Sequence, residues 1–182
     1  MAHVGKLPQV HRYITTHDAN GKAIFSNAVP EENTMKPVGE MGFALGYTTK
    51  TFPVQLGDDA DIETYKPFLA DAPGLTVSGG TVLRHVDFPP DTTCSMHRTV
   101  SLDYGVVLEG ELELILDSGE TKLMKRGDVA VQRGTMHAWR NPHKTEWARM
   151  MFVLQPCEQV LIDGKPLKED FMTKIDGLKA SE

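Results

Sequence analysis

Two histidines, His97 and His137, stand in the stretches HRTVSLDYGVVLEG and GDVAVQRGTMHAWRN. An imidazole titrates near neutral pH, so it can act as a general acid or base, and its neutral form is a common metal ligand. The same stretches contain a carboxylate, Asp103, and a guanidinium, Arg133. Arg133 is a candidate catalytic residue that would hold a substrate carboxylate in bidentate geometry, although a surface salt bridge explains it equally well.

The spacing in these stretches resembles the two signature motifs of the cupin family. In the first motif His97 is followed by a second ligand position two residues on, by an acid after a short loop, and by Gly110 seven residues past that acid. The second motif ends in Gly-x-x-His-x-x-x-Asn, which Gly134, His137 and Asn141 match. The surrounding residues look like those of small single-domain cupins from fungal polyketide and other secondary-metabolite gene clusters, some of which are described as oxidoreductases.

The resemblance also implies a metal site, which this chain keeps in part. The familiar cupin ligands are three His and one Glu. Here Thr99 stands at the second His, Asp103 replaces the Glu, and Gln132 stands where a Pro is usual. His97, Asp103 and His137 remain, which matches the two-His, one-carboxylate set of non-haem Fe(II) sites. We expect a divalent metal, Fe(II) in preference to Zn²⁺, while a metal-free pocket with a buried structural His97 stays open.

Geometry restricts how these ligands could meet. Six residues of a straight strand span roughly 20 Å, whereas a ligand atom lies about 2 Å from its metal. The chain must therefore turn between His97 and Asp103, within residues 100–102, and His137 must come from a neighbouring strand. His85 could replace the missing ligand, but a structural role is the stronger expectation. For Trp139 we expect core packing, with an aromatic wall for a flat substrate as the alternative.

The elements that position these residues read as all-β. Short apolar or alternating runs separated by turn residues predict strands at GGTVLRHVDF, ELELILD, VAVQ and WARMMFVLQ. With the resemblance, this predicts a single cupin β-barrel, or jelly roll, over residues 75–160.

The segments on either side of the barrel are expected to pack on it, within one structural domain. Residues 1–74 read as a hairpin followed by an irregular stretch over 26–72, with a short helix near 62–69. Residues 161–182 read as a C-terminal amphipathic helix, because apolar residues recur there at helical spacing: Leu167, Phe171, Ile175 and Leu178.

Composition limits the partners. The formal net charge is −6, so nucleic acid is not expected to bind, and no apolar run is long enough to suggest a membrane span. Two cysteines provide no disulfide framework, and a reducing cytoplasm is the default location. If five apolar side chains share the outer face of the sheet, something must cover them: Val100, Leu102, Tyr104, Val106 and Leu108. A second subunit or the N-terminal segment could do so, and we expect a homodimer.

Three functions follow from this interpretation. The first is a metal-dependent oxidoreductase of secondary metabolism that acts on a small aromatic or polyketide-like metabolite. The second is a lyase or isomerase, such as a decarboxylase or dehydratase, in which His97 or His137 acts as acid or base. The third is a non-catalytic cupin that binds a small molecule.

Overall fold

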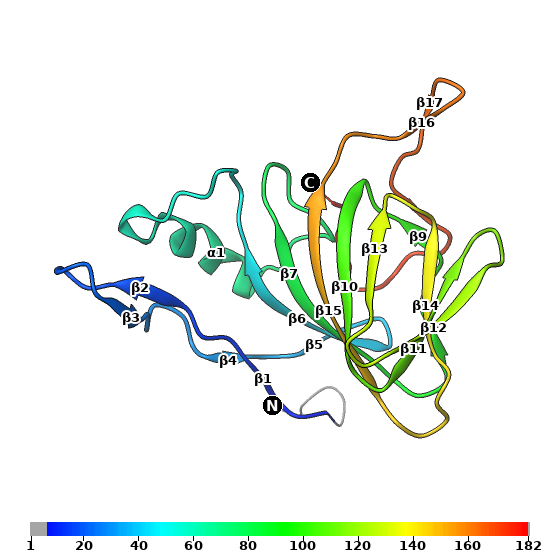
Figure 1. Cartoon of the computed structure of the whole chain (residues 1–182), viewed down its shortest axis with the longest axis horizontal. Coiled ribbons are helices and arrows are strands. Elements are labelled where there is room, and N and C mark those ends of the chain that lie inside the picture. Colours follow the sequence, from blue (N-terminus) through cyan, green and yellow to red (C-terminus); the bar gives the residue numbers. More distant parts are fainter. Residues whose placement is uncertain (1–6, 182) are drawn as a thin grey trace.

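The computed structural model describes residues 7–181, which form two main antiparallel sheets around one core (Figure 1). The first sheet has six strands in the order β13 (Val129–Arg133), β10 (Ser101–Glu109), β15 (Ala148–Pro156), β7 (Val82–Phe88), β6 (Met41–Thr48) and β5 (Lys36–Val38). The second has the order β12 (Thr121–Lys125), β11 (Glu111–Leu116), β14 (His137–Asn141), β9 (His97–Arg98) and β18 (Asp170–Phe171), and β8 (Thr92–Thr93) also pairs with β14. The strands predicted from residue 75 onward are confirmed.

Smaller elements surround these sheets. Three two-stranded ribbons pair β1 (Val10–His11) with β4 (Glu32–Asn33), β2 (Thr15–His17) with β3 (Ala23–Phe25), and β16 (Leu161–Ile162) with β17 (Lys165–Pro166). A 3-10 turn, η1 (Gly57–Asp59), leads into α1 (Ala60–Ala70), which is the one α-helix within residues 7–181. The predicted hairpin and short helix are therefore confirmed. None of the helices in residues 7–181 is both long and apolar enough to span a bilayer.

Side chains from both main sheets meet in the core. Val86, Val107 and Phe152 come from the first sheet, and Leu112 and Trp139 come from the second. The arrangement is consistent with the expected jelly roll, although no hydrogen-bonded ladder in the described residues joins the two sheets into a closed barrel. The space between the two facing sheets is where inward-pointing side chains can form a site.

The period of two along β10 decides which residues enter that space. Ser101, Asp103 and Val107 are buried, whereas Leu102 and Tyr104 are partly exposed on the other face. The odd-numbered residues therefore point into the barrel and the even-numbered ones point outward. Leu102 and Tyr104, which point outward, belong to the apolar set for which the sequence predicts a cover by a second subunit or the N-terminal segment.

The prediction of an irregular stretch over 26–72 is wrong at residues 41–48, where β6 pairs with both β5 and β7. The strand lacks a clear alternation of polar and apolar residues because it is covered on both faces. On one side Phe43 packs against the barrel core, and on the other the Tyr47 hydroxyl donates a hydrogen bond to Asp61 of α1 at 2.6 Å. Such a doubly covered strand has no polar face to produce the pattern.

The predicted C-terminal helix is also wrong, because no helix is present between residues 161 and 181. Asp163 and Gly164 have positive φ and close the β16–β17 ribbon, after which β18 pairs with the edge of β9. Phe171 and Leu178 still pack on the barrel core, but from a non-helical chain that pairs with β9 through β18. The helical spacing was real, and tertiary pairing with an open strand edge overrode it.

Candidate functional site

His97 and His137 lie directly opposite each other on neighbouring strands. They are register partners in the antiparallel pair of β9 and β14, so their side chains leave the same face of the sheet. The centroids of the two rings are 4.4 Å apart, and both residues line one cavity inside the barrel. The prediction that two imidazoles from separate strands enter one shared cavity is confirmed.

Hydrogen bonds fix the tautomer of both rings. Nδ1 of His97 lies 2.8 Å from the Ser95 carbonyl oxygen, and Nδ1 of His137 lies 2.9 Å from that of Thr135. A carbonyl oxygen only accepts, so each Nδ1 carries the proton and donates it. In the neutral rings this leaves the lone pair of each Nε2 available for a proton or a metal ion.

Burial keeps the rings neutral at physiological pH. Desolvation lowers the pKa of His137 to about 3, and the neighbouring His97 lowers it further in the same direction. Burial also lowers the pKa of His97, although the Ser95 carbonyl opposes this. Two neutral imidazoles with free Nε2 atoms form a donor set suited to a transition-metal ion.

Asp103 lines the same cavity but belongs to the opposite sheet, on β10. The chain leaves β9 after Arg98 and enters β10 at Ser101, which puts the predicted turn at residues 99–100. Within residues 7–181 no group of three or more His, Cys, Asp or Glu side chains is close enough together to hold a metal. The structure thus brings the two histidines together and leaves Asp103 across the cavity from them.

Thr99, at the second ligand position, is bound to this carboxylate. Its hydroxyl donates to Oδ2 of Asp103 at 3.4 Å and accepts a hydrogen bond from Ser101 Oγ at 2.7 Å. Oδ1 of Asp103 is buried without a partner, and burial raises the pKa of this carboxyl to about 6. Gln132, the register partner of Asp103 on β13, is also buried with a partnerless Nε2.

Arg133 and His85 do not reach the cavity. Arg133 follows the inward-facing Gln132, so it points outward, is exposed, and pairs in register with Leu102. The predicted catalytic role of Arg133 is therefore wrong for a cavity-based site, because the period of a strand places it on the other face. His85 is register partner to Ala44 and Met151 on the outer face of β7 and does not replace the missing ligand.

Three other residues lie at the cavity or next to its histidines. Trp139 is 3% exposed and packs edge-on to Phe152 at 5.7 Å, which confirms its expected core packing, and it also lines the cavity. Phe171 of β18 stacks on His97 with ring centroids 5.6 Å apart. Arg84 of β7 also lines the cavity. Sequence reasoning missed Phe171 because it was assigned to a helix. It missed Arg84 although the run LRHVDF alternates, which was the available signal.

Comparison with known proteins supports the motif-based interpretation. Residues 84–154 match the family described as Cupin domain. The chain is 50% identical over 163 residues to the phomopsin biosynthesis cluster protein C' of Diaporthe leptostromiformis, covering 89% of this chain and 86% of that protein. It is 48% identical to the oryzines biosynthesis cluster protein J of Aspergillus oryzae, covering 90% of this chain and 92% of that protein.

A third relative has a name that states an activity. The chain is 41% identical over 160 residues to the cupin-domain-containing oxidoreductase virC of Hypocrea virens, covering 86% of this chain and 81% of that protein. Identity of this size over most of both chains indicates common descent and a common fold. With the two motif histidines facing each other inside the barrel, the chain belongs to the cupin family, in a group whose named relatives come from fungal biosynthetic clusters.

Proposed function

We propose that this protein is a metal-dependent oxidoreductase that acts on a small metabolite of fungal secondary metabolism. The observation that carries the proposal is the pair of neutral imidazoles, His97 and His137, with both Nε2 lone pairs available in one cavity. The relatives named as cupin-domain-containing oxidoreductases support the reaction class.

The residues present fit a metal ion through two nitrogen ligands. Each Nδ1–H is held by a backbone carbonyl, which orients the ring and keeps Nε2 basic. When bound there, Fe(II) would supply the redox chemistry with oxygen, and Zn²⁺ would supply Lewis acidity alone. The protein's own part is to hold the ion with His97 and His137 and to keep bulk water out with the apolar wall that includes Trp139 and Phe152.

The test is metal content and oxygen dependence. For protein purified without chelators, elemental analysis should find iron, and anaerobic titration with Fe(II) should show one site per chain. His97→Ala and His137→Ala should each weaken Fe(II) binding by more than tenfold, because either change leaves a single nitrogen ligand. His17→Ala is the control, since His17 is exposed on the β2–β3 hairpin. Unchanged Fe(II) affinity in both cavity variants, with folding verified by circular dichroism, would refute the proposal.

A second candidate is a metal-free lyase or isomerase. It is favoured by Asp103, whose pKa near 6 and partnerless Oδ1 suit a group that takes up and releases a proton near neutral pH. Turnover of a metabolite in the presence of a chelator and without oxygen uptake would favour this candidate over the oxidoreductase. Tight binding of the metabolite with no turnover would favour a non-catalytic binding protein.

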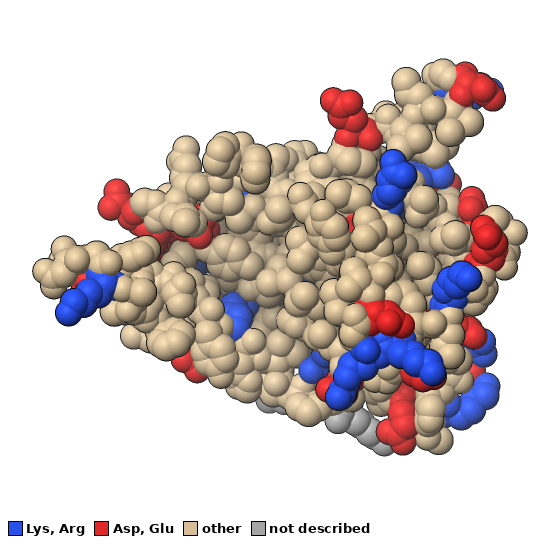
Figure 2. Space-filling model, viewed as in Figure 1, with Lys and Arg blue, Asp and Glu red and all other residues tan. Residues whose placement is uncertain are grey.

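We also propose that the chain forms a homodimer through the outer face of β10 and β13. Tyr104, Val129 and Val131 are 39%, 57% and 56% exposed there, and Figure 2 shows few charged residues over these strands. The N-terminal segment contacts the sheet elsewhere, where Arg149 of β15 donates to the Pro8 carbonyl at 2.8 Å. Since β13 is the edge of its sheet in the described residues, a second copy is the occupant that could cover the face and continue the sheet.

Sedimentation analysis tests the dimer. Val131→Glu should convert a dimer to a monomer, because it places a charge in an apolar interface. Leu123→Glu is the matched control, since Leu123 is 49% exposed on β12 of the other sheet. A wild-type monomer at all concentrations, or a dimer that Val131→Glu leaves intact, would contradict the proposal.

A further inference from the structure

A larger pocket adjoins the histidine cavity. It has a volume of about 450 Å³, whereas the histidine cavity has about 60 Å³. Pockets that bind small molecules have volumes of about 300–1,000 Å³, so the larger pocket can hold a metabolite and the smaller one holds a few waters. Phe43, Arg84 and Leu178 line both spaces and therefore form the boundary between them.

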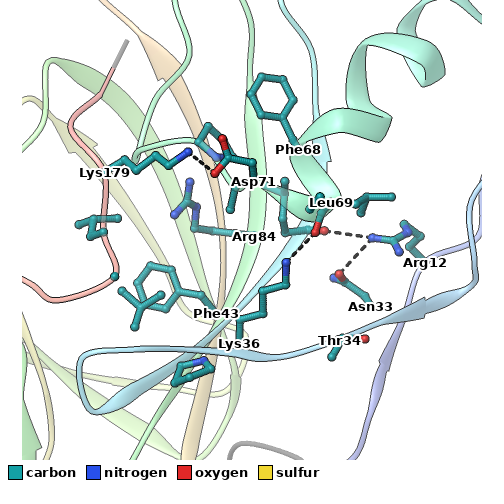
Figure 3. A pocket seen from close by; sticks show the side chains of 18 of the residues that line it. Arg12, Asn33, Thr34, Lys36, Phe43, Phe68, Leu69, Asp71, Arg84 and Lys179 are labelled. Atoms are coloured by element: carbon teal, nitrogen blue, oxygen red, sulfur yellow. Dashed lines mark hydrogen bonds and ion pairs between the residues drawn. The ribbon is translucent and has the colours of Figure 1, made fainter. Parts of the chain in front are cut away.

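Arg84 occupies the centre of this boundary, between Phe43 and the Lys179–Asp71 ion pair (Figure 3). Its side chain is 5% exposed, and Nη2 donates to the carbonyl oxygens of Gly74 at 2.5 Å and Leu75 at 3.4 Å. Nε is buried without a partner. A buried guanidinium is costly unless an anion compensates its charge.

None of the acidic side chains in residues 7–181 forms an ion pair with Arg84. Arg149 is paired in bidentate fashion with Asp87, but no acidic side chain within residues 7–181 lies within ion-pair distance of Arg84. Asp103 is the acid whose charge acts on Arg84, without a hydrogen bond or ion pair between them; burial raises its pKa to about 6, so this carboxyl is mostly ionised at neutral pH. Burial lowers the pKa of Arg84 to about 10, so the side chain is still cationic at neutral pH.

The larger pocket as a whole is cationic, although the chain has a net charge of −6. Four cationic side chains line it against two acidic ones: Arg12, Lys36, Arg84 and Lys179 against Glu32 and Asp71. Several of these are already engaged. Lys179 pairs with Asp71, and Arg12 donates to the carbonyl oxygens of Pro30, Glu32 and Leu45. Arg84 is thus the buried cationic side chain of this pocket that has no ion-pair partner among residues 7–181.

We propose that Arg84 binds the carboxylate of the substrate, which makes the substrate class a small organic acid. This rests on the proposed function, because it places the acid's reacting part beside His97 and His137. The carboxylate neutralises Arg84 at the boundary, a small reacting group beside it faces the histidine cavity, and the bulk of the molecule lies in the larger pocket beside Phe43 and Phe68. Gln132, whose Nε2 has no partner, supplies a further N–H donor on the wall of the histidine cavity.

Benzoate and its neutral isostere benzamide are suitable probes, with binding followed by NMR titration of the full chain. Wild-type protein should bind benzoate at least tenfold more tightly than benzamide. Arg84→Gln should lower benzoate affinity at least tenfold and abolish the preference. Arg126→Gln, at an arginine exposed near Glu109, should change neither affinity. Equal affinity of the wild type for both probes, or full benzoate affinity in Arg84→Gln, would overturn the proposal.

Two further measurements keep the test decisive. If Arg84→Gln does not fold, Arg84→Lys retains the charge, and it should still prefer benzoate to benzamide. Loss of that preference in folded Arg84→Lys would contradict the proposal, because a cation would still stand at the boundary. If Arg84→Lys does not fold either, the wild-type protein alone is the test: tighter binding of benzoate than of benzamide supports the proposal, and equal binding overturns it.

The failure of this proposal can be told apart from the failure of the metal proposal. His97→Ala and His137→Ala should retain benzoate binding, because Arg84 is on the opposite sheet. Conversely, Arg84→Gln should retain Fe(II) binding, because it removes neither imidazole.

Discussion

Replacing Asp103 with Asn should change how the stability of the protein depends on pH. Asp103 is 4% exposed, and burial raises the pKa of its carboxyl from 3.8 to about 6 in the folded protein. The folded state therefore binds more protons than the unfolded state between about pH 4 and pH 6. The amide introduced by Asp103→Asn does not titrate, so the variant lacks this contribution.

The sign and size follow from the two pKa values. Protonated Asp103 favours the folded state below the unfolded pKa of 3.8, and this contribution is lost as the pH rises through about 6. A pKa difference of about 2, at about 1.4 kcal/mol for each pKa unit, amounts to about 3 kcal/mol. Because a small part of this is already lost at pH 4, the free energy of unfolding of Asp103→Asn, relative to wild type, should rise by about 2 kcal/mol from pH 4 to pH 7.

Urea unfolding at pH 4, 5, 6 and 7, followed by tryptophan fluorescence, measures this difference. The low pKa of His137 gives stability a slope of opposite sign, but it is common to both proteins and cancels in the comparison. Any cost of an unsatisfied Asn amide is independent of pH, so the change with pH is the diagnostic quantity. Asp117→Asn, on the exposed end of the β11 turn, is the control. Parallel pH curves for Asp103→Asn and wild type would show that the carboxyl is not destabilised by burial.

Two further changes test how the site is supported. Asp87→Asn should cost about 3–5 kcal/mol of unfolding free energy, because it leaves the guanidinium of Arg149 buried without its bidentate partner; urea unfolding at pH 7 measures it. Gly74→Ala should loosen residues 171–181, because a Cβ at residue 74 would collide with the backbone carbonyl of Ala180; amide hydrogen exchange in those residues should rise at least tenfold.

Each change has a matched control. Glu111→Gln removes one partner of an exposed pair with Lys125 and should cost less than about 1 kcal/mol. Gly57→Ala adds a Cβ where no atom lies within 4 Å and should leave exchange in the C-terminal segment unchanged. A small effect of Asp87→Asn would mean that water reaches the pair. Unchanged exchange in Gly74→Ala would mean that the C-terminal segment can shift without detaching.

The barrel strands could be predicted from the sequence because they either are short apolar runs between turns, such as β15, or alternate between a buried and a more exposed face. ELELILD alternates for this reason, and Leu112 is indeed in the core. The same logic fails for β6, which is covered on both faces, and for β18, whose pairing partner lies far earlier in the chain, with Phe171 opposite His97. Local pattern carries no information about a strand edge that a distant segment will cover.

The residues of the candidate site likewise differ in how far the sequence could place them. Motif spacing correctly predicted that His97 and His137 enter one cavity from neighbouring strands, since β9 and β14 are adjacent in one sheet. It could not place Asp103 relative to them, because that distance depends on how the two sheets stack, and facing sheets lie about 10 Å apart. The cavity consequently has one wall with two imidazoles and an opposite wall with a carboxyl, an amide and a guanidinium. A ligand bound where this cavity meets the larger pocket must present a carboxylate to Arg84 and a small reacting group to the imidazoles while its bulk stays in the larger pocket, which fits a small organic acid.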